Sequence, residues 1–371
     1  MTAVLLVLLA LLAGALVYSL LSIVAAFRYL SVRPPVLQSR EPISILKPLS
    51  GLDLGLESNL RTFFEQDYPE FEILFGASDS ADPAVAEIER LKAEFPVLPI
   101  RLLVISPKTA NAKVGVLEEL AAAANHSILL VNDSDVRVSP DYLRRVVAPL
   151  EDPGVGMVTC LYRARPSSWP GRLEAIGIAT DFAPSALVSR LVGVSEFAFG
   201  STMLFRAEDL ARIGGFAALA DYIADDYQLG RRIHDLGKRV VIARSVVETS
   251  LADRTWGDVW RHQLRWARTI RVSRGGGYAG LPLSNATLWS VLLAAVGAWW
   301  AAVPLLLLRL VMALVVGRLL LEDRRVLAGL FLVPLRDLAG IVLWAAGLFG
   351  STVDWRGTRL RLNRDGKIVR A

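Results

Sequence analysis

The stretch Ile128-Leu-Leu-Val131-Asn-Asp133-Ser-Asp135 is an apolar run that ends abruptly in two carboxylates. Four consecutive aliphatic residues predict a buried strand, and acidic residues spaced i, i+2 can leave its end on the same side. Ligands bind beyond the carboxyl ends of strands in open α/β sheets. Two carboxylates held there suit a hard cation such as Mg²⁺ or Mn²⁺. The stretch therefore predicts a metal site at Asp133 and Asp135, although Asp-x-Asp also occurs in surface turns.

Residues 41–250 alternate between short apolar runs and amphipathic helical stretches, which is typical of an α/β domain. The expected strands are residues 43–46, 71–76, 100–105, 127–131, 156–161 and 239–243. The expected helices between them include residues 83–95, 114–124 and 140–150. Continuous apolar runs suit strands that are buried on both faces, so we predict a mostly parallel, Rossmann-like sheet with helices on both sides.

The first 27 residues contain no charged side chain. A helix of about 20 apolar residues spans the hydrocarbon core of a bilayer. A cleavable signal peptide would have a basic start and a shorter apolar core, so residues 1–27 are expected to form a permanent membrane anchor. Arg28, Arg33 and Arg40 follow the anchor, and positive charge beside a membrane span favours the cytoplasmic side. The α/β domain is therefore expected to face the cytoplasm.

Residues 251–275 are predicted to form an amphipathic helix that lies along the membrane interface. Apolar blocks in residues 278–353 predict two or three membrane-spanning or interfacial helices, and residues 354–371 form a basic tail that we expect in the cytoplasm. A cytoplasmic domain and a cytoplasmic tail require an even number of crossings between them. Three apolar blocks conflict with that requirement, so either one block is interfacial or the tail lies on the far side.

The composition excludes several classes of site and partner. The net charge of +5 is modest, and the arginine-rich segments lie near predicted membrane helices or the site, which favours lipid headgroups or a diphosphate over nucleic acid. Cys160 is the only cysteine, so no intrachain disulfide can form, and we expect it to be a buried apolar residue. Three histidines without close spacing argue against zinc. No obligate protein partner is expected.

Two polar motifs stand next to expected elements of the α/β domain. Asp79 follows an expected strand, where it could contact a ligand or, like Ser80 and Asp82, cap the next helix. Asn111 and Lys113 stand just before an apolar helix, where a lysine and the helix dipole can together bind a phosphate. A solvated loop lysine is the alternative.

Two further motifs combine charge with aromatic residues. Asp225 and Asp226 are adjacent carboxylates in an apolar and aromatic setting, which is unfavourable unless they are paired or used, and one of them could act as a general base. A helix N-terminal charge is the alternative for Asp225. In Arg261-His-Gln-Leu-Arg265-Trp266, helical spacing can aim a guanidinium at a phosphate and stack an indole beside a substrate. An interfacial basic helix would explain the same residues.

The order of these motifs resembles that in processive and lipid-directed glycosyltransferases of the GT-A fold. Longer stretches narrow the resemblance to the ceramide glucosyltransferase family: Ile43-Ser-Ile-Leu-Lys47-Pro-Leu-Ser-Gly51, Asn59-Leu-Arg-Thr-Phe-Phe-Glu-Gln-Asp67-Tyr-Pro69, Asp133-Ser-Asp135, Ile223-Ala-Asp-Asp-Tyr227 and Asp354-Trp-Arg-Gly-Thr-Arg359. The resemblance covers nearly the whole chain, including the anchor and the C-terminal apolar blocks. Bacterial hopanoid-associated glycosyltransferases are similar to about the same degree. The resemblance therefore implies a multi-pass protein of the bacterial inner membrane.

The family pattern implies a role for individual residues. Asp226 is the implied catalytic base. The implied nucleotide-sugar ligands are Lys47, Asp79, Asn111, Lys113, Asp133, Arg265 and Trp266. The implied acceptor side consists of Gly200, Ser201 and Asp225. The implied ligands of Mg²⁺ or Mn²⁺ are Asp133 and Asp135.

Two positions depart from the family pattern. His262 stands three residues before Arg265, where the family usually has Gln or Arg, which leaves the phosphate contacts of that helix open. Asp135 stands where animal members have glycine, so its assignment to the metal rests on its chemistry as well as on the resemblance.

The resemblance implies inverting transfer of a hexose from a UDP-sugar to a hydroxyl of a membrane lipid. Glucose is the family's usual sugar, with N-acetylglucosamine as the alternative, and the lipid could be ceramide, a hopanoid or diacylglycerol. Two other functions stay open. A processive polysaccharide synthase would need more membrane helices for its channel. An inactive membrane scaffold would not be expected to keep the full set of acidic motifs.

Overall fold

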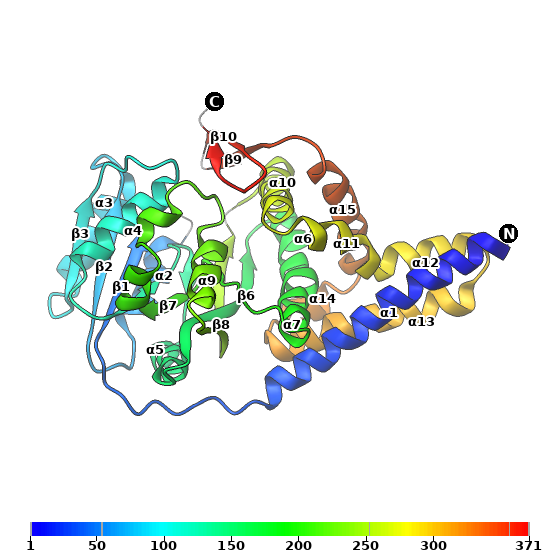
Figure 1. Ribbon diagram of the computed structural model, residues 1–371, viewed down its shortest axis with the longest axis horizontal. Helices are drawn as coiled ribbons and strands as arrows, with labels where there is room; N and C mark the ends of the chain where they lie inside the picture. The colour runs from blue at the N-terminus through cyan, green and yellow to red at the C-terminus, as the bar shows by residue number, and fades with distance from the viewer. Residues whose placement is uncertain (1, 53–54, 252, 356, 370–371) are drawn as a thin grey trace.

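An eight-stranded sheet forms the centre of the α/β part of the chain (Figure 1). The computed structural model describes residues 2–52, 55–251, 253–355 and 357–369. The strands lie in the order β3-β2-β1-β4-β7-β6-β8-β5. Their bounds are β1 Ile43–Pro48, β2 Phe71–Ala77, β3 Ile100–Val104, β4 Ile128–Val131, β5 Val136–Arg137, β6 Val155–Pro166, β7 Met203–Arg206 and β8 Arg239–Leu251.

The sheet is mixed, because only part of it follows the parallel pattern. β1 pairs in parallel with β2 and β4, β2 pairs in parallel with β3, and β6 pairs in parallel with β8. β7 is antiparallel to both β4 and β6, and β5 is antiparallel to β8. The six predicted strands are all present. β5 and β7 were not predicted, because β5 has only two residues and β7 has only three apolar residues before Arg206.

The antiparallel pairing of β4 with β7 decides where polar residues gather. Val131, the last residue of β4, is opposite Met203, the first residue of β7. The chain that leaves β4 therefore lies beside the chain that enters β7. Asp133 on the first segment and Gly200 on the second are brought together in this way.

Side chains of the central strands alternate between two apolar cores. Ile45 of β1 lies in a core that includes α3 (Pro83–Glu94). Its neighbour Leu46 lies in the core on the opposite face, with α4 (Ala112–Ala123) and α9 (Asp225–Asp235). This is the two-residue period of a strand that is covered on both faces, as predicted.

A helical segment that was not predicted connects β6 to β7. It consists of α6, a single π-helical turn and α7. The other helices of this half are short and follow the strands. The bounds are α2 Leu56–Phe64, α5 Tyr142–Val147, α6 Trp169–Gly177, the π-helical turn Ile178–Phe182, α7 Ala183–Leu191 and α8 Ala207–Arg212.

Three helices form an arm that projects away from the sheet: α1 (Thr2–Ser31), α12 (Ala286–Ala295) and α13 (Trp299–Ala313) (Figure 1). Among the described residues, two helical segments are long and apolar enough to cross a membrane. These segments are Ala3–Ser31 and Trp299–Leu320. Both belong to the arm, so the arm is the part of the chain that suits a bilayer.

The surface of the arm is apolar as well. Several aliphatic side chains are exposed along the length of α1, among them Val4, Leu6, Val17 and Val24. A continuous apolar surface of this kind is unfavourable in water and supports membrane association.

The C-terminal part has one segment of sufficient length in its described residues, fewer than the two or three expected. α12 has 10 residues and α15 (Leu332–Gly347) has 16, which is less than a bilayer core requires. Two shorter helices complete this part, α11 (Gly275–Gly280) before α12 and α14 (Arg325–Ala328) before α15.

The basic tail is folded against the α/β half. Its three antiparallel strands lie beside α10 (Trp256–Ser273), the amphipathic helix (Figure 1). The amide of Ile368 donates to the carbonyl of Asp221 at 2.7 Å, so the tail and the sheet lie on the same side of the arm. The chain therefore runs away from the sheet along α12 and back toward it along α13. The strands are β9 Thr352–Trp355, β10 Thr358–Leu362 and β11 Ile368–Val369.

Four charged side chains meet where the arm joins the sheet domain, and we call them the arm cluster: Arg309 of α13, Arg336 and Asp337 of α15, and Asp181 of the π-helical turn. Arg309 pairs with both oxygens of Asp337 at 2.5 and 2.9 Å and reaches Asp181 at 3.0 Å. Arg336 lies 3.3 Å from the other oxygen of Asp181. Two cations therefore balance two anions.

Candidate active site

Four charged residues from three segments of the chain meet where β4 and β7 adjoin, and we call them the acidic cluster: Lys113, Asp133, Asp225 and Asp226. The Lys113 ammonium lies 2.9 Å from Oδ1 of Asp133 and 3.2 Å from Oδ2 of Asp225. The amide of Gly200 donates to Oδ2 of Asp226 at 3.0 Å. A Cβ atom added at Gly200 would lie 3.0 Å from Oδ2 of Asp133, so glycine allows this close approach. The structure thus brings five predicted site residues together.

The start of α9 orients the two adjacent carboxylates. Asp225 and Asp226 occupy its first turn, where the partial positive charge of a helix N-terminus favours anions. Oδ1 of Asp226 accepts from the amide of Tyr227 at 2.7 Å. Because Gly200 holds the other oxygen, both oxygens of Asp226 are fixed by main-chain donors.

Asn111 and Ser201 are buried parts of the frame around the cluster. Asn111 caps α4 by accepting from the amide of Val114 at 3.2 Å, and its Nδ2 donates to the carbonyl of Tyr222 at 2.7 Å. The carbonyl of Ser201 accepts from Nδ2 of Asn132 at 2.6 Å. Both ends of the Asn111 amide are therefore used within the protein, and contact of Asn111 or Ser201 with a substrate stays a prediction.

The charges of the acidic cluster shift one another's protonation. Burial and the negative charge of Asp225 raise the pKa of Asp226 to about 6, although Lys113 opposes the shift. Burial disfavours the charge on Lys113, but Asp133 and Asp225 outweigh it and raise the pKa of the ammonium. Lys113 therefore stays charged at neutral pH. A carboxylate whose pKa lies near neutrality is suited to act as a general base.

The strand-end geometry expected for Asp133 and Asp135 is wrong, because β4 ends at Val131 and a turn follows. The period of two therefore does not set the directions of their side chains. The side chain of Asp133 is 40% exposed and accessible to a ligand. The described part of the chain holds no group of three side chains suited to bind a metal. One or two carboxylates with substrate phosphates are a usual Mg²⁺ site, so these residues fit a cation shared with a diphosphate.

Asp79 does not cap the helix that follows it. Asp82 caps α3 by accepting from the amide of Ala84 at 2.8 Å, and its other oxygen accepts from Gly51 at 2.8 Å. The Asp79 carboxylate lies on the exposed loop after β2 and accepts from the amide of Ala81 at 2.9 Å. The capping alternative for Asp79 is excluded, and its contact with a nucleotide stays a prediction.

Lys47 is fully buried at the end of β1, beneath the loop that carries Asp133 and Asp135. Its Nζ donates to the carbonyl of Asp133 at 3.3 Å and lies 3.5 Å from the ring centroid of Phe63. Burial lowers the pKa of Lys47 to about 7, although the two carboxylates oppose the shift. Lys47 thus supports the loop from below, and direct contact with a donor sugar stays a prediction.

Trp266 belongs to an aromatic cluster that extends to the acidic cluster. The ring centroid of Phe182 lies 6.4 Å from that of Trp266 and 4.7 Å from those of Tyr162 and Phe199. Phe199 directly precedes Gly200. The helix that carries the Arg265-Trp266 motif is thereby connected through packed rings to the backbone that holds the candidate base.

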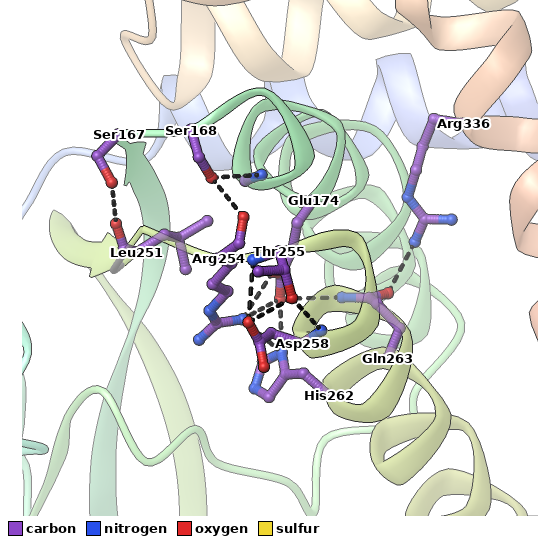
Figure 2. Close-up of polar contacts among 11 residues, drawn as sticks. Ser167, Ser168, Glu174, Leu251, Arg254, Thr255, Asp258, His262, Gln263 and Arg336 are labelled. Carbon is purple, nitrogen blue, oxygen red and sulfur yellow. Dashed lines mark hydrogen bonds and ion pairs between the residues drawn. The ribbon is translucent and has the colours of Figure 1, made fainter.

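Glu174 of α6 anchors the start of α10, as Figure 2 shows. Its buried carboxylate accepts from Nη1 of Arg254 at 2.6 and 2.8 Å and lies 2.5 Å from Nδ1 of His262. Gln263 donates to it at 3.1 Å and accepts from Arg336 of the arm cluster at 3.1 Å. A chain of polar contacts therefore runs from the arm to the face of α10 that carries the predicted motif.

His262 belongs to the network of polar contacts around Glu174. Its ring lies against Glu174 and is 4.9 Å from the ring of Trp266. Burial by itself would raise the pKa of Glu174, but His262 and Arg254 outweigh it and hold the pKa at about 2. His262 therefore fixes the orientation of α10, on which Arg265 and Trp266 stand.

Glu174 and Tyr162 were missed in the sequence. Glu174 is a single acidic residue within the largely apolar stretch Leu173-Glu-Ala-Ile-Gly177, and such isolation is a usable signal. Tyr162 is buried in the aromatic cluster, and burial together with nearby carboxylates raises its pKa well above the usual range. It stands in β6 without any local pattern that separates it from other core residues.

The comparisons with known proteins identify the family and the fold. The family model described as Glycosyl transferase family 21 matches residues 5–368. Ceramide glucosyltransferase 1 of Caenorhabditis elegans is 26% identical over 204 residues, which are 54% of this chain and 44% of that protein. The ceramide glucosyltransferase of Komagataella phaffii is 32% identical over 121 residues, which are 31% of this chain and 24% of that protein. The matches thus cover less than half of each relative.

The solved structures include a match in fold. The mannosyltransferase PcManGT from Pyrobaculum calidifontis, in complex with GDP-Man and Mn²⁺, has a TM-score of 0.60 and is 20% identical, over 91% of this chain and 97% of that chain. The predicted GT-A-like fold is confirmed by this likeness. Because the family model spans nearly the whole chain, we conclude that the chain belongs to glycosyl transferase family 21.

Proposed function

We propose that the chain is a membrane-bound, inverting glycosyltransferase that moves a hexose from a UDP-sugar to a hydroxyl of a membrane lipid, with glucose and ceramide as the first pair to test. The observation that carries the proposal is the acidic cluster, in which the candidate base Asp226 and the candidate nucleotide ligand Asp133 both adjoin Gly200. Membership of the family supplies the reaction class, and the names of the two curated relatives suggest the acceptor.

The donor side of the proposal uses Lys113, Asp133 and Asp135. Lys113 lies near the start of α4, where an ammonium and the helix N-terminus can both attract a diphosphate. When bound by Asp133 and Asp135, Mg²⁺ or Mn²⁺ would neutralise the charge that develops on the leaving diphosphate. Lys113 would add a second positive charge to the same group.

The chemical step uses Asp226 as a general base. It takes the proton of the lipid hydroxyl as that oxygen bonds to the anomeric carbon, while the bond from this carbon to the diphosphate oxygen breaks. Attack from the face opposite the leaving group inverts the configuration. The amides of Gly200 and Tyr227 keep the carboxylate in one orientation throughout. General-base assistance contributes roughly 10²–10⁴-fold to the rate.

The acceptor side uses the aromatic cluster and the arm. The arm would hold the protein in the bilayer, where the apolar chains of the acceptor remain. Phe182, Phe199 and Trp266 would form the apolar surface next to which the lipid hydroxyl reaches Asp226. In this arrangement the sheet domain and the tail both lie on the cytoplasmic side.

The test is a transfer assay with the full chain in lipid nanodiscs. UDP-glucose and UDP-N-acetylglucosamine are each combined with ceramide, a hopanoid polyol or diacylglycerol, in the presence of Mn²⁺ or Mg²⁺. Mass spectrometry of the extracted lipids reports the sugar mass and the acceptor together. NMR of the product reports the anomeric configuration.

We expect a single hexose on ceramide, in the β configuration from the α-linked donor. A polymer of sugars would replace the proposal with a polysaccharide synthase. Transfer to the hopanoid or to diacylglycerol would keep the reaction class and replace the acceptor. Absence of turnover and of UDP binding with every pair would overturn the proposal and favour a scaffold.

A further inference from the structure

The C-terminal sheet contacts the segment that leads into the two carboxylates of α9. The amide of Ile368 donates to the carbonyl of Asp221 at 2.7 Å, and the amide of Ile223 donates to the carbonyl of Gly366 at 3.3 Å. These bonds form the pattern of an antiparallel pair. Asp225 follows Ile223 by two residues, so the tail holds the chain immediately before the candidate base.

Side chains reinforce this attachment. Tyr222 lies opposite Lys367 in the antiparallel bridge, and Nζ of Lys367 lies 5.3 Å from the centroid of its ring. On the other face, four apolar side chains form a small core that joins the tail to the same segment. These residues are 2–8% exposed: Ile223, Val353, Leu362 and Ile368.

The other end of the tail is held by α10. Nη1 of Arg268 donates to the carbonyl of Thr352, the first residue of β9, and its Nε donates at 3.1 Å to that of Phe349, just before the sheet. Gly350 has a φ of +74°, a left-handed conformation that favours glycine. Arg265 lies one helical turn before Arg268.

We propose that the C-terminal sheet is a positioning element of the catalytic centre, which fixes the distance between the segment that carries Asp226 and the helix that carries Arg265 and Trp266. The proposal rests on the proposed function for the roles of these residues. A displacement of about 1 Å at a catalytic group can lower the rate about 10²-fold. A segment with free main-chain groups would not hold Asp226 to that tolerance.

A purely protective cover would make different contacts. It would bury apolar surface and leave the main chain beneath it paired with its own domain. Here the carbonyl of Asp221 and the amide of Ile223 find partners in the tail. The tail therefore completes the hydrogen bonding of the segment, as an added strand does for a sheet edge.

The first experiment measures hydrogen exchange in the full chain and in a chain that ends at Ser351, both in nanodiscs. We expect the amides of residues 221–228 and of α10 to exchange at least about tenfold faster in the shortened chain, because local opening becomes easier. The amides of β1, β2 and β4 should keep their protection, which shows that the domain is folded. Unchanged exchange at residues 221–228 would overturn the proposal.

The second experiment measures turnover with whichever donor and lipid the full chain uses. The shortened chain should lose about 10²-fold in kcat and recover activity when a peptide of residues 350–371 is added. Full activity without the peptide would overturn the proposal. If the full chain turns over no pair, the proposed function fails, whereas the exchange measurement still decides the positioning role.

Point variants test whether the hydrogen bonds between the tail and residues 221–223 matter, or only the presence of the tail. Ile368→Pro removes the amide that donates to Asp221, so it should raise exchange at residues 221–228 and lower kcat. The matched control is the double variant Arg359→Ala, Arg361→Ala, which changes exposed side chains of β10 in the same sheet. Equal losses in both variants would contradict a specific role for the attachment.

Discussion

The acidic cluster and the arm cluster each contain four charged side chains, yet their charges are balanced differently. In the arm cluster, two arginines face two aspartates, and the central pair of Arg309 and Asp337 is 4% and 2% exposed. In the acidic cluster, three carboxylates face the single ammonium of Lys113, and two negative charges are left over. The side chains of Asp133 and of Asp181 in the arm cluster are both 40% exposed, so exposure does not distinguish the two clusters.

The difference shows how a structural ion cluster can be told from a site. Buried charge without a partner is unfavourable, so a cluster that only joins helices is expected to be neutral. A cluster that keeps excess charge beside an accessible carboxylate can still bind a cation or take up a proton. Local charge balance is thus more informative here than the number or the exposure of the charged residues.

Replacing Asp226 by Asn should have the largest effect. The amide keeps the size of the side chain but cannot take the proton of the acceptor, so kcat should fall roughly 10²–10⁴-fold. UDP affinity, measured by calorimetry, should stay close to that of the unchanged protein. Near-normal turnover would show that the excess charge of the acidic cluster has another use.

Replacing Arg309 by Met tests the other cluster. It leaves Asp337 buried without its partner and should lower the free energy of unfolding by about 3–5 kcal/mol, measured as thermal unfolding in nanodiscs. The double variant Arg309→Met, Asp337→Leu removes both charges and should recover much of the loss. If the double variant is as unstable as the single one, charge balance is not what stabilises this junction.

Replacing Asp135 by Ala should weaken metal and UDP binding together. Losing one carboxylate from a shared site should raise the Mn²⁺ concentration needed for half-maximal activity by about 10–100-fold, by analogy with other lost supporting ligands. A metal titration at fixed UDP-sugar measures this. The control is Asp365→Ala, on an exposed turn of the tail. If Asp135→Ala needs the same Mn²⁺ concentration as Asp365→Ala, Asp135 is not a ligand of the metal.

The pH dependence should show the smallest change. The pKa of Asp226 is raised to about 6, so its ionised, active form is lost as the pH falls through that value, and kcat should drop about tenfold per unit below it. Asp225→Asn removes a charge that raises this pKa and should move the acid limb to lower pH. If the acid limb does not move, the charge of Asp225 does not raise the pKa of Asp226.

Uninterrupted apolar runs made much of the sheet predictable. Strands in which buried and exposed side chains alternate, and very short strands, could not be predicted. Residues 128–131 are buried on both faces and match the predicted strand. β8 was expected to end at residue 243 but continues to Leu251, because its second half alternates between buried and half-exposed side chains. The tail strands were not predicted, because they have only two to five residues and mix polar or charged side chains with the apolar residues that pack.

Candidate site residues could be predicted where a short local motif contains them. Contacts between residues far apart in the sequence could not be predicted. Asp133, Asp225 and Asp226 stand in local motifs, and the structure brings them together around Lys113. The pairing of Glu174 with His262 joins residues 88 positions apart, which no local pattern can reveal. The end of β4 at residue 131 was predicted correctly, but the directions of the Asp133 and Asp135 side chains depend on the turn that follows, which the period of a strand does not describe.

The attachment of Ile368 to Asp221 closes a loop that contains the entire out-and-back path of the arm. Contacts between residues so far apart in the chain form late in folding, after the local elements. The tail can pair with residues 221–223 only after α12 and α13 have both inserted correctly and the chain has come back to the side of the sheet. Turnover would then report on correct membrane insertion, and a wrongly inserted chain would have an intact sheet but turn over about 10²-fold more slowly.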